Sequence, residues 1–126
     1  MDSASYVKPG YFSFYGRISR KTFWLSYVLL AFVVMLGASI VVTGLFSVLP
    51  PDHPAFIGVW IVLAILYIAL IVASLSAQVK RLHDRGRSGW FVLLSLVPIA
   101  NIWIFIEVAF LKGTTGPNDF GPDPLG

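Results

Sequence analysis

Two long runs without any Asp, Glu, Lys or Arg, residues 22–51 and 54–79, dominate the sequence. Uncharged apolar runs of 18 or more residues are typical of transmembrane helices, because about 20 residues at a rise of 1.5 Å cross a hydrocarbon core about 30 Å thick. The 126 residues are only 12% charged, whereas soluble domains carry about 25% charged residues. We therefore predict one all-α integral membrane domain, residues 1–126, with helical spans at 22–49 and 55–79.

A third apolar segment, residues 90–111, is long enough to cross the membrane once, but Pro98 stands near its centre. Proline is tolerated inside membrane helices, so one kinked span is the default expectation. The alternative is a re-entrant segment broken at Pro98, in which Asn101 caps a second short helix. Both alternatives give three hydrophobic helical segments, and Glu107 is the only acidic or basic residue within them.

The segments between these runs differ in their content of Lys and Arg. The cations lie in an interfacial N-terminal segment (1–21), in a basic loop (80–89) and, with Lys112 alone, in a Gly/Pro-rich tail (112–126), while the loop between the first two spans has none. Because Lys and Arg gather in cytoplasmic segments, we predict that the N-terminus and the basic loop are cytoplasmic. A true third span would place the tail outside, and a re-entrant segment would return it to the cytoplasm.

Several classes of function are disfavoured by composition. The chain has no cysteine, so no disulfide, CxxC metal site or thiol nucleophile is available. The net charge of +3 comes from cations at the ends of apolar helices, which suits anionic lipid headgroups better than nucleic acid. Asp52 and His53 are too few for a metal site, and His83 has no oriented third group beside it for a catalytic relay. We expect no catalytic residue, cofactor or metal.

Three blocks of the sequence resemble a known family. They are FYGRISRKTFW at 14–24, RLHDRGRSGW at 81–90 and GTTGPNDFGPDP at 113–124. Together, in this order and at this spacing, they are similar to the signature blocks of domain-of-unknown-function family 805, which are small bacterial inner-membrane proteins. The resemblance implies a multi-pass protein of the bacterial inner (plasma) membrane, and it implies no mechanism, since the family has no assigned activity.

The clustered cations admit two interpretations. Guanidinium groups suit phosphate geometry, so one hypothesis is a cytoplasmic site for anionic lipid headgroups; the other is that these charges only set topology. The candidate residues are Arg17, Arg20, Lys21, Arg81, Arg85 and Arg87. A second set is expected to brace the helix ends together, either through Arg17 or Arg20 pairing with Asp84 or through tail aspartates meeting the arginines of the basic loop. That set is His83, Asp84, Asn118, Asp119 and Asp123.

Ala69, Ala73 and Ala77 recur at every fourth position and form a ridge of small residues on one face of the second span. Such ridges favour close helix packing in lipid, either within the chain or in a homo-oligomer or larger membrane complex. We predict a non-catalytic structural, scaffold or accessory membrane component that contacts anionic lipids. The alternative is a small oligomeric transporter or channel-like subunit, and a membrane-embedded enzyme is the least favoured class.

Overall fold

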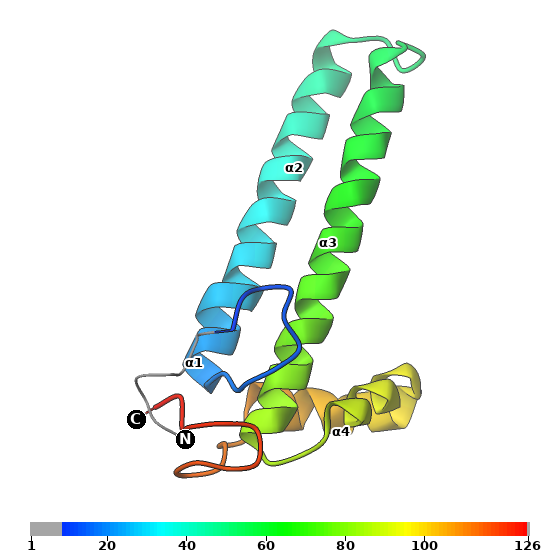
Figure 1. Cartoon of the computed structure of the whole chain (residues 1–126). Coiled ribbons are helices and arrows are strands. Elements are labelled where there is room, and N and C mark those ends of the chain that lie inside the picture. Colours follow the sequence, from blue (N-terminus) through cyan, green and yellow to red (C-terminus); the bar gives the residue numbers. More distant parts are fainter. Residues whose placement is uncertain (1–8, 126) are drawn as a thin grey trace.

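The computed structural model describes residues 9–125, and every element of regular secondary structure among them is helical (Figure 1). The part of the predicted interfacial segment before residue 9, including Lys8, lies outside the described residues. In chain order the elements are α1 (Arg20–Thr22), η2 (Phe23–Val28), α2 (Leu29–Val48), α3 (Ala55–Asp84), η3 (Gly89–Leu96) and α4 (Pro98–Ala109).

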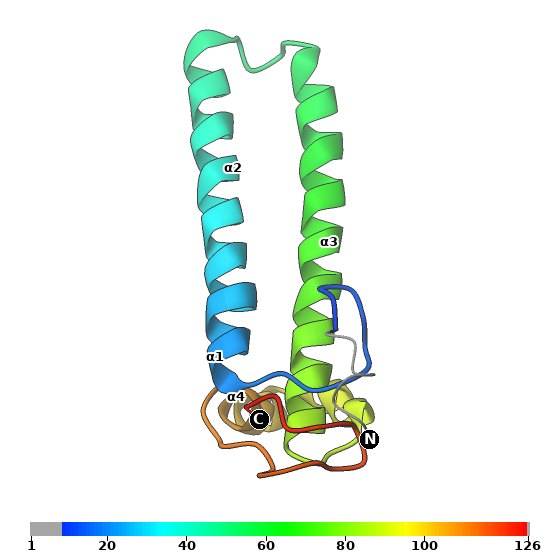
Figure 2. The ribbon, with the colours of Figure 1, turned by 60° about the vertical axis from the view of Figure 1, so that its left-hand side comes forward.

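The first three elements form one continuous helix, Arg20–Val48, which runs antiparallel to α3 in a long hairpin (Figures 1 and 2). Its start is capped by Ser19, whose hydroxyl oxygen accepts a 3.2 Å hydrogen bond from the backbone N–H of Thr22. Leu49 is extended and two prolines follow it, which ends the helix because proline cannot donate a backbone hydrogen bond. Both helices are apolar and long enough to cross a membrane.

The C-terminal end of α3 has a glycine stop. Gly86 adopts φ +77°, a left-handed conformation that an L side chain rarely takes. The N–H of Gly86 donates to the carbonyl of His83 at 2.9 Å, and the N–H of Arg87 donates to the carbonyl of Leu82 at 2.9 Å. These two bonds close the last turn of the helix and redirect the chain toward η3.

The expected third span over residues 90–111 is not confirmed. Val97 is extended at φ −96° and ψ 122°, and Pro98 is the first residue of α4, so the break falls where proline disfavours a helical residue before it. Val97 rather than Asn101 is the residue before α4, while the side-chain amide of Asn101 donates to the carbonyl of Ser95 at 2.7 Å. The two short helices η3 and α4 lie across the foot of the hairpin (Figure 1), and the 12 residues of α4 would extend only about 18 Å.

The foot of the hairpin also gathers the segments outside the helices. Residues 9–19 run beside the lower part of α3, and the tail from residue 110 folds under the same end (Figures 1 and 2). We call this end the base, defined as residues 9–19, 80–89 and 110–125. All three sequence blocks singled out above therefore contribute to one end of the molecule.

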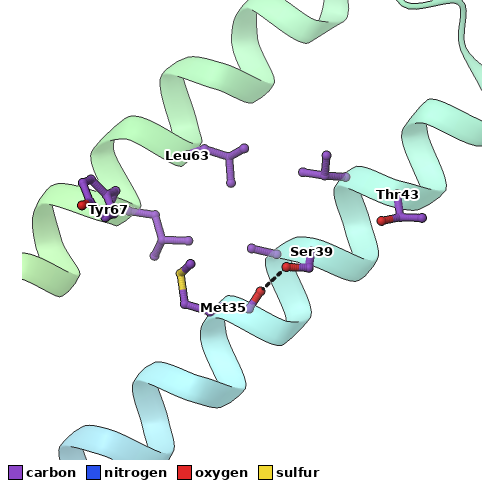
Figure 3. A pocket seen from close by; sticks show the side chains of 8 residues that line it. Met35, Ser39, Thr43, Leu63 and Tyr67 are labelled. Atoms are coloured by element: carbon purple, nitrogen blue, oxygen red, sulfur yellow. Dashed lines mark hydrogen bonds between the residues drawn. The ribbon is translucent and has the colours of Figure 1, made fainter.

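The upper parts of α2 and α3 leave apolar space between them. Figure 3 shows Met35, Ser39 and Thr43 from α2 and Leu63 and Tyr67 from α3 around a pocket of about 410 Å³. A second pocket of about 600 Å³, lined only by apolar residues and glycines, lies along the same pair of helices.

The alanine ridge lies lower on α3 than these pockets. Ala77 is 1% exposed within the core, and Ala69 and Ala73 are half-buried. Ala73 and Ala77 line a third pocket, of about 230 Å³, together with Tyr27 of the first helix. The lower part of the ridge therefore faces the chain's own hairpin.

The fold places the loop between α2 and α3 at the opposite end from the tail, which predicts opposite sides of the membrane. The chain has no cysteine, so Asp52→Cys and Leu125→Cys each create one reactive site, both at exposed residues. In intact cells a membrane-impermeant maleimide is expected to label one variant and not the other. Permeabilised cells, in which both variants should react, are the control, and labelling of both in intact cells would restore the third span.

Candidate functional site

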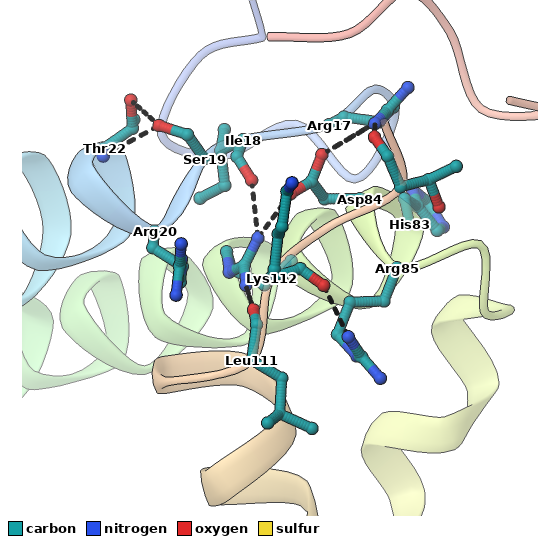
Figure 4. A network of polar contacts seen from close by, with 12 residues as sticks. Arg17, Ile18, Ser19, Arg20, Thr22, His83, Asp84, Arg85, Leu111 and Lys112 are labelled. Carbon is teal, nitrogen blue, oxygen red and sulfur yellow. Dashed lines mark hydrogen bonds and ion pairs between the residues drawn. The ribbon is translucent and has the colours of Figure 1, made fainter. Parts of the chain in front are cut away.

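The centre of the base is the carboxylate of Asp84, which pairs with two buried arginines; Figure 4 shows its contact with Arg17. Arg17 Nε donates to Asp84 Oδ1 at 3.0 Å, and Arg81 Nη1 donates to Asp84 Oδ2 at 2.5 Å. Arg17 is 1% exposed, Arg81 0% and Asp84 4%. Removing such charges from water is costly, so their stability depends on close pairing and on partners for the remaining donors.

Backbone carbonyls accept the other hydrogen bonds of the two guanidinium groups. Arg17 donates to carbonyls of the tail. Arg81 donates to one carbonyl in the last turn of α4, to the carbonyl of Leu111, and to one carbonyl of the N-terminal segment. The acceptors of Arg17 are the carbonyls of Thr114 (2.6 Å), Gly116 (2.7 Å) and Gly121 (3.1 Å); those of Arg81 are the carbonyls of Leu111 (2.6 Å), Val108 (2.7 Å) and Ile18 (3.1 Å). The two arginines thus tie the N-terminal segment, α3, α4 and the tail together.

Close approach of the tail to Asp84 requires a glycine at position 113. A Cβ atom on Gly113 would lie 1.9 Å from Asp84 Oδ2, which no packing adjustment at this buried carboxylate accommodates easily. The next residue, Thr114, donates its backbone N–H to the carbonyl of Asp84 at 2.6 Å. The glycine that opens the third sequence block is therefore explained by contact with the second block.

The rest of the tail docks on His83. The imidazole stacks on Phe120 with ring centroids 4.1 Å apart, and its Nδ1 lies 3.0 Å from the carbonyl of Gly16. Asn118 Nδ2 donates to the His83 carbonyl at 2.9 Å. Asp123 accepts from the backbone N–H groups of Leu125 and Gly116, and these bonds hold the pKa of its carboxyl below the ordinary value.

Of the two bracing arrangements expected from the sequence, the structure contains the pairing of Arg17 with Asp84. The tail aspartates do not meet the arginines of the basic loop. Asp123 bonds to tail backbone, and Asp119 is exposed, with no ion pair among residues 9–125. The reason is that Asp84 and Glu107 already occupy the arginines of residues 80–89.

Glu107 forms a second ionic cluster that the sequence did not identify. Its Oε1 accepts from Arg85 Nε at 3.1 Å and from Arg87 Nε, and its Oε2 accepts from Trp103 Nε1 at 2.9 Å. Burial opposes ionisation of this carboxyl, but the hydrogen bonds and charges of Arg87 and Arg85 outweigh it and hold the pKa below the ordinary value. The apparent intramembrane carboxylate is thus the anchor that fixes α4 to the residues after α3.

A third polar cluster holds the N-terminal segment against α3. Lys80 is fully buried; its Nζ donates to the carbonyl of Gly10 at 2.5 Å and to the hydroxyl of Tyr27, whose ring centroid lies 4.7 Å away. Ser76 Oγ donates to the carbonyl of Tyr11 at 2.5 Å. A lysine ammonium group placed above an aromatic ring is attracted to it by a cation–π interaction. Nothing in the sequence spacing shows that residues 27 and 80 meet.

The six cations predicted to bind headgroups therefore do not form a single exposed site. Arg17 and Arg81 are buried and bonded, and Arg85 and Arg87 pair with Glu107 while staying partly exposed. Arg20 and Lys21 are exposed, as is Lys112 of the tail. Arg20 and Lys112 line the same small polar depression, so the fully exposed cations in and next to the base are a smaller group than the six predicted from the sequence.

The buried polar groups of the described residues have partners within the protein. Among residues 9–125 no group of three or more His, Asp or Glu side chains is arranged to hold a metal ion. Every buried side-chain nitrogen or oxygen atom described has a hydrogen-bond partner. The polar groups inside the base are accordingly engaged in holding it together.

A two-helix apolar hairpin standing on a compact polar base defines a small helical membrane protein. The chain belongs to the family described as protein of unknown function DUF805, whose profile matches residues 11–122. Two similar proteins are the inner membrane protein YhaH of Escherichia coli K12 and the inner membrane protein YhaI of the same organism. Identity to YhaH is 34% over 98% of this chain and 97% of the relative; identity to YhaI is 35% over 94% and 91%.

These findings confirm the family predicted from the three sequence blocks, and the relatives together with the apolar helices support a bacterial inner-membrane protein. No solved structure matches the chain.

Asp84→Asn is expected to destabilise the protein by about 3–5 kcal/mol, because it leaves two buried guanidinium groups without their shared counter-charge. Denaturation of the purified protein in mixed micelles by increasing SDS measures the change. Asp119→Asn makes the same chemical change at an exposed residue and should alter the free energy of unfolding by less than about 0.5 kcal/mol. Equal effects of the two variants would contradict the role assigned to Asp84.

The lowered pKa of Glu107 predicts a contribution to acid sensitivity. A carboxyl whose pKa is lower in the folded state stabilises the protein above its unfolded pKa, and that stabilisation is lost as the pH falls through the folded value. The wild type should therefore lose stability below about pH 4.5, the ordinary value for this group, more steeply than Glu107→Gln. The measurement is the difference between the two pH–stability curves; parallel curves would show that Glu107 does not contribute.

Proposed function

We propose that this protein is a non-catalytic accessory component of the inner membrane, whose base lies on the cytoplasmic side and contacts anionic lipid headgroups. The observation that carries the proposal is the network around Asp84, in which Arg17 and Arg81 bind backbone carbonyls from the N-terminal segment, α4 and the tail. This network uses the buried polar groups for structure. It also holds the N-terminal segment, α4 and the tail together at one end of the two apolar helices.

The distribution of charge supports contact with lipid. All Lys and Arg residues from position 9 onward lie in the base or in the first turn of the helix above it, and the loop at the far end of the hairpin has none. By the positive-inside tendency, this arrangement favours a cytoplasmic base, so that Asp52→Cys would be the variant labelled from outside.

The exposed cations are the groups available to a membrane surface. Arg20, Lys21 and Lys112 are all exposed, and Arg20 Nη1 also donates to the carbonyl of Phe110 at 3.0 Å, which holds this side chain at the end of α4. A Lys or Arg near an anionic leaflet contributes about 1 kcal/mol. Three such side chains at one end would give a measurable preference for anionic over zwitterionic lipid.

A small oligomeric transporter or channel-like subunit is the second candidate. It is favoured by the open pockets between α2 and α3, of about 410 and 600 Å³. Within residues 29–79 the only acidic, basic or histidine side chains are those of the loop, Asp52 and His53. One hairpin therefore provides no charged pathway, and transport would require several copies to line one.

The lipid proposal is tested with the protein reconstituted in vesicles that contain pyrene-labelled phosphatidylglycerol or, separately, pyrene-labelled phosphatidylcholine. Energy transfer from the tryptophans measures which lipid is enriched next to the protein. The triple variant Arg20→Gln, Lys21→Gln, Lys112→Gln should lose most of the preference for phosphatidylglycerol, by up to about fivefold for each cation removed.

The matched control keeps the charges and changes the side chains: Arg20→Lys, Lys21→Arg and Lys112→Arg together. This variant should keep the preference of the wild type. If the triple glutamine variant also keeps it, these cations do not recruit anionic lipid, and the charges of the base serve folding and topology alone.

A further inference from the structure

A mixed polar and apolar pocket of about 330 Å³ lies where the foot of the hairpin meets the bend between η3 and α4. The volume falls at the lower end of the range of about 300–1,000 Å³ that is usual for small-molecule sites. Its walls come from η2, α3, η3 and α4. The lining residues are Phe23, Val28, Ser74, Gln78, Ser95, Asn101, Ile104, Phe105 and Val108.

The polar groups of this pocket are not part of the ionic base. Gln78 Nε2 donates to Ser74 Oγ at 3.3 Å, one turn earlier on α3, and Asn101 Nδ2 donates to the carbonyl of Ser95 at 2.7 Å. Among residues 9–125, no hydrogen bond is made to Gln78 Oε1 or to Asn101 Oδ1, and none is donated by the Ser74 hydroxyl. Two acceptors, the Ser74 hydroxyl and the second N–H of each of the two amide groups therefore remain for an occupant.

The depth of the pocket distinguishes it from a site for charged headgroups. Gln78 precedes Lys80, the first residue of the base on α3, and Phe23, Ile104 and Val108 of the pocket wall are buried core residues. The pocket thus lies between the base and the apolar upper part of the hairpin. Among residues 9–125, no Asp, Glu, Lys or Arg lines it, and a charged ligand would lose its hydration there without gaining a counter-charge.

Ordinary acyl chains do not match the chemistry of these walls. A hydrocarbon chain has neither donor nor acceptor. An amide group that faces only hydrocarbon therefore lacks hydrogen-bond partners, which costs free energy. A small neutral head that carries carbonyl or hydroxyl oxygens can form hydrogen bonds with these polar side chains, and an attached apolar body fits the apolar walls. Its carbonyl can accept from Ser74 or Gln78, its hydroxyl can donate to Asn101 or Gln78, and its apolar body can lie against Phe23, Phe105 and Val108.

We infer that this pocket is a binding site for a neutral amphiphile with a carbonyl- or hydroxyl-bearing head and an apolar body. Two sources in a bacterial membrane offer carbonyl oxygens beside an apolar body: the glycerol ester region of a diglyceride, whose hydroxyl can also donate, and the ring of a prenyl quinone, which can only accept. The site is separate from the exposed cations, because Arg20, Lys21 and Lys112 are not among its lining residues.

The test uses the full-length protein in nanodiscs made from phosphatidylcholine and measures saturable binding of two probes, radiolabelled dioctanoylglycerol and ubiquinone-1. Gln78→Leu removes the amide while keeping a side chain of similar size, and it should weaken binding of the active probe about tenfold through the loss of one or two hydrogen bonds. Ser74→Phe fills the cavity and should abolish saturable binding.

Ser39→Ala is the matched control, since it removes a hydroxyl that donates to the carbonyl of Met35 at 2.9 Å in a different pocket; it should bind as the wild type does. Gln78-dependent binding of dioctanoylglycerol identifies the glyceride as the source, and Gln78-dependent binding of ubiquinone-1 identifies the quinone. Absence of saturable binding for both probes, or binding that is unchanged in Gln78→Leu and Ser74→Phe, would overturn the inference.

Discussion

The structure depends on one carboxylate shared by two buried arginines. Asp84 supplies the counter-charge for both Arg17 and Arg81, and their other donors bind carbonyls from segments that have no regular structure of their own. A guanidinium group suits this role because its donors point in fixed directions in one plane. The residues around helix ends are usually the least constrained parts of a membrane protein, whereas here they are the most heavily bonded.

The base also explains how so short a chain organises a membrane hairpin. The two long helices leave pockets between them in their upper parts, and there is no hydrophobic driving force to close such gaps inside a bilayer. The core residues instead gather low in the molecule, where Ile18, Tyr27, Leu82, Ile104 and others pack together. The relative position of α2 and α3 is therefore set chiefly from one end.

The sequence predicted the features that depend on local chemistry. The two spans followed from the absence of charge over long runs, and a break at Pro98 was the alternative to one kinked span because proline lacks a backbone donor. The third span is not confirmed, because a length of 22 residues permits a crossing without requiring one, and the contacts of Glu107 with Arg85 and Arg87 hold α4 at the foot of the hairpin. Pairings such as Lys80 with Tyr27 join residues 53 positions apart, and periodicity carries no information about them.

The bonds made by Arg17 have a consequence for the order in which the protein is built. Its carbonyl partners in the tail lie 97 to 104 residues further along the chain, so this arginine leaves the ribosome long before they exist. Residues 20–84, which include both long helices and Asp84, are synthesised before residues 114–121. The base can therefore close around Arg17 only after this part of the tail has been translated.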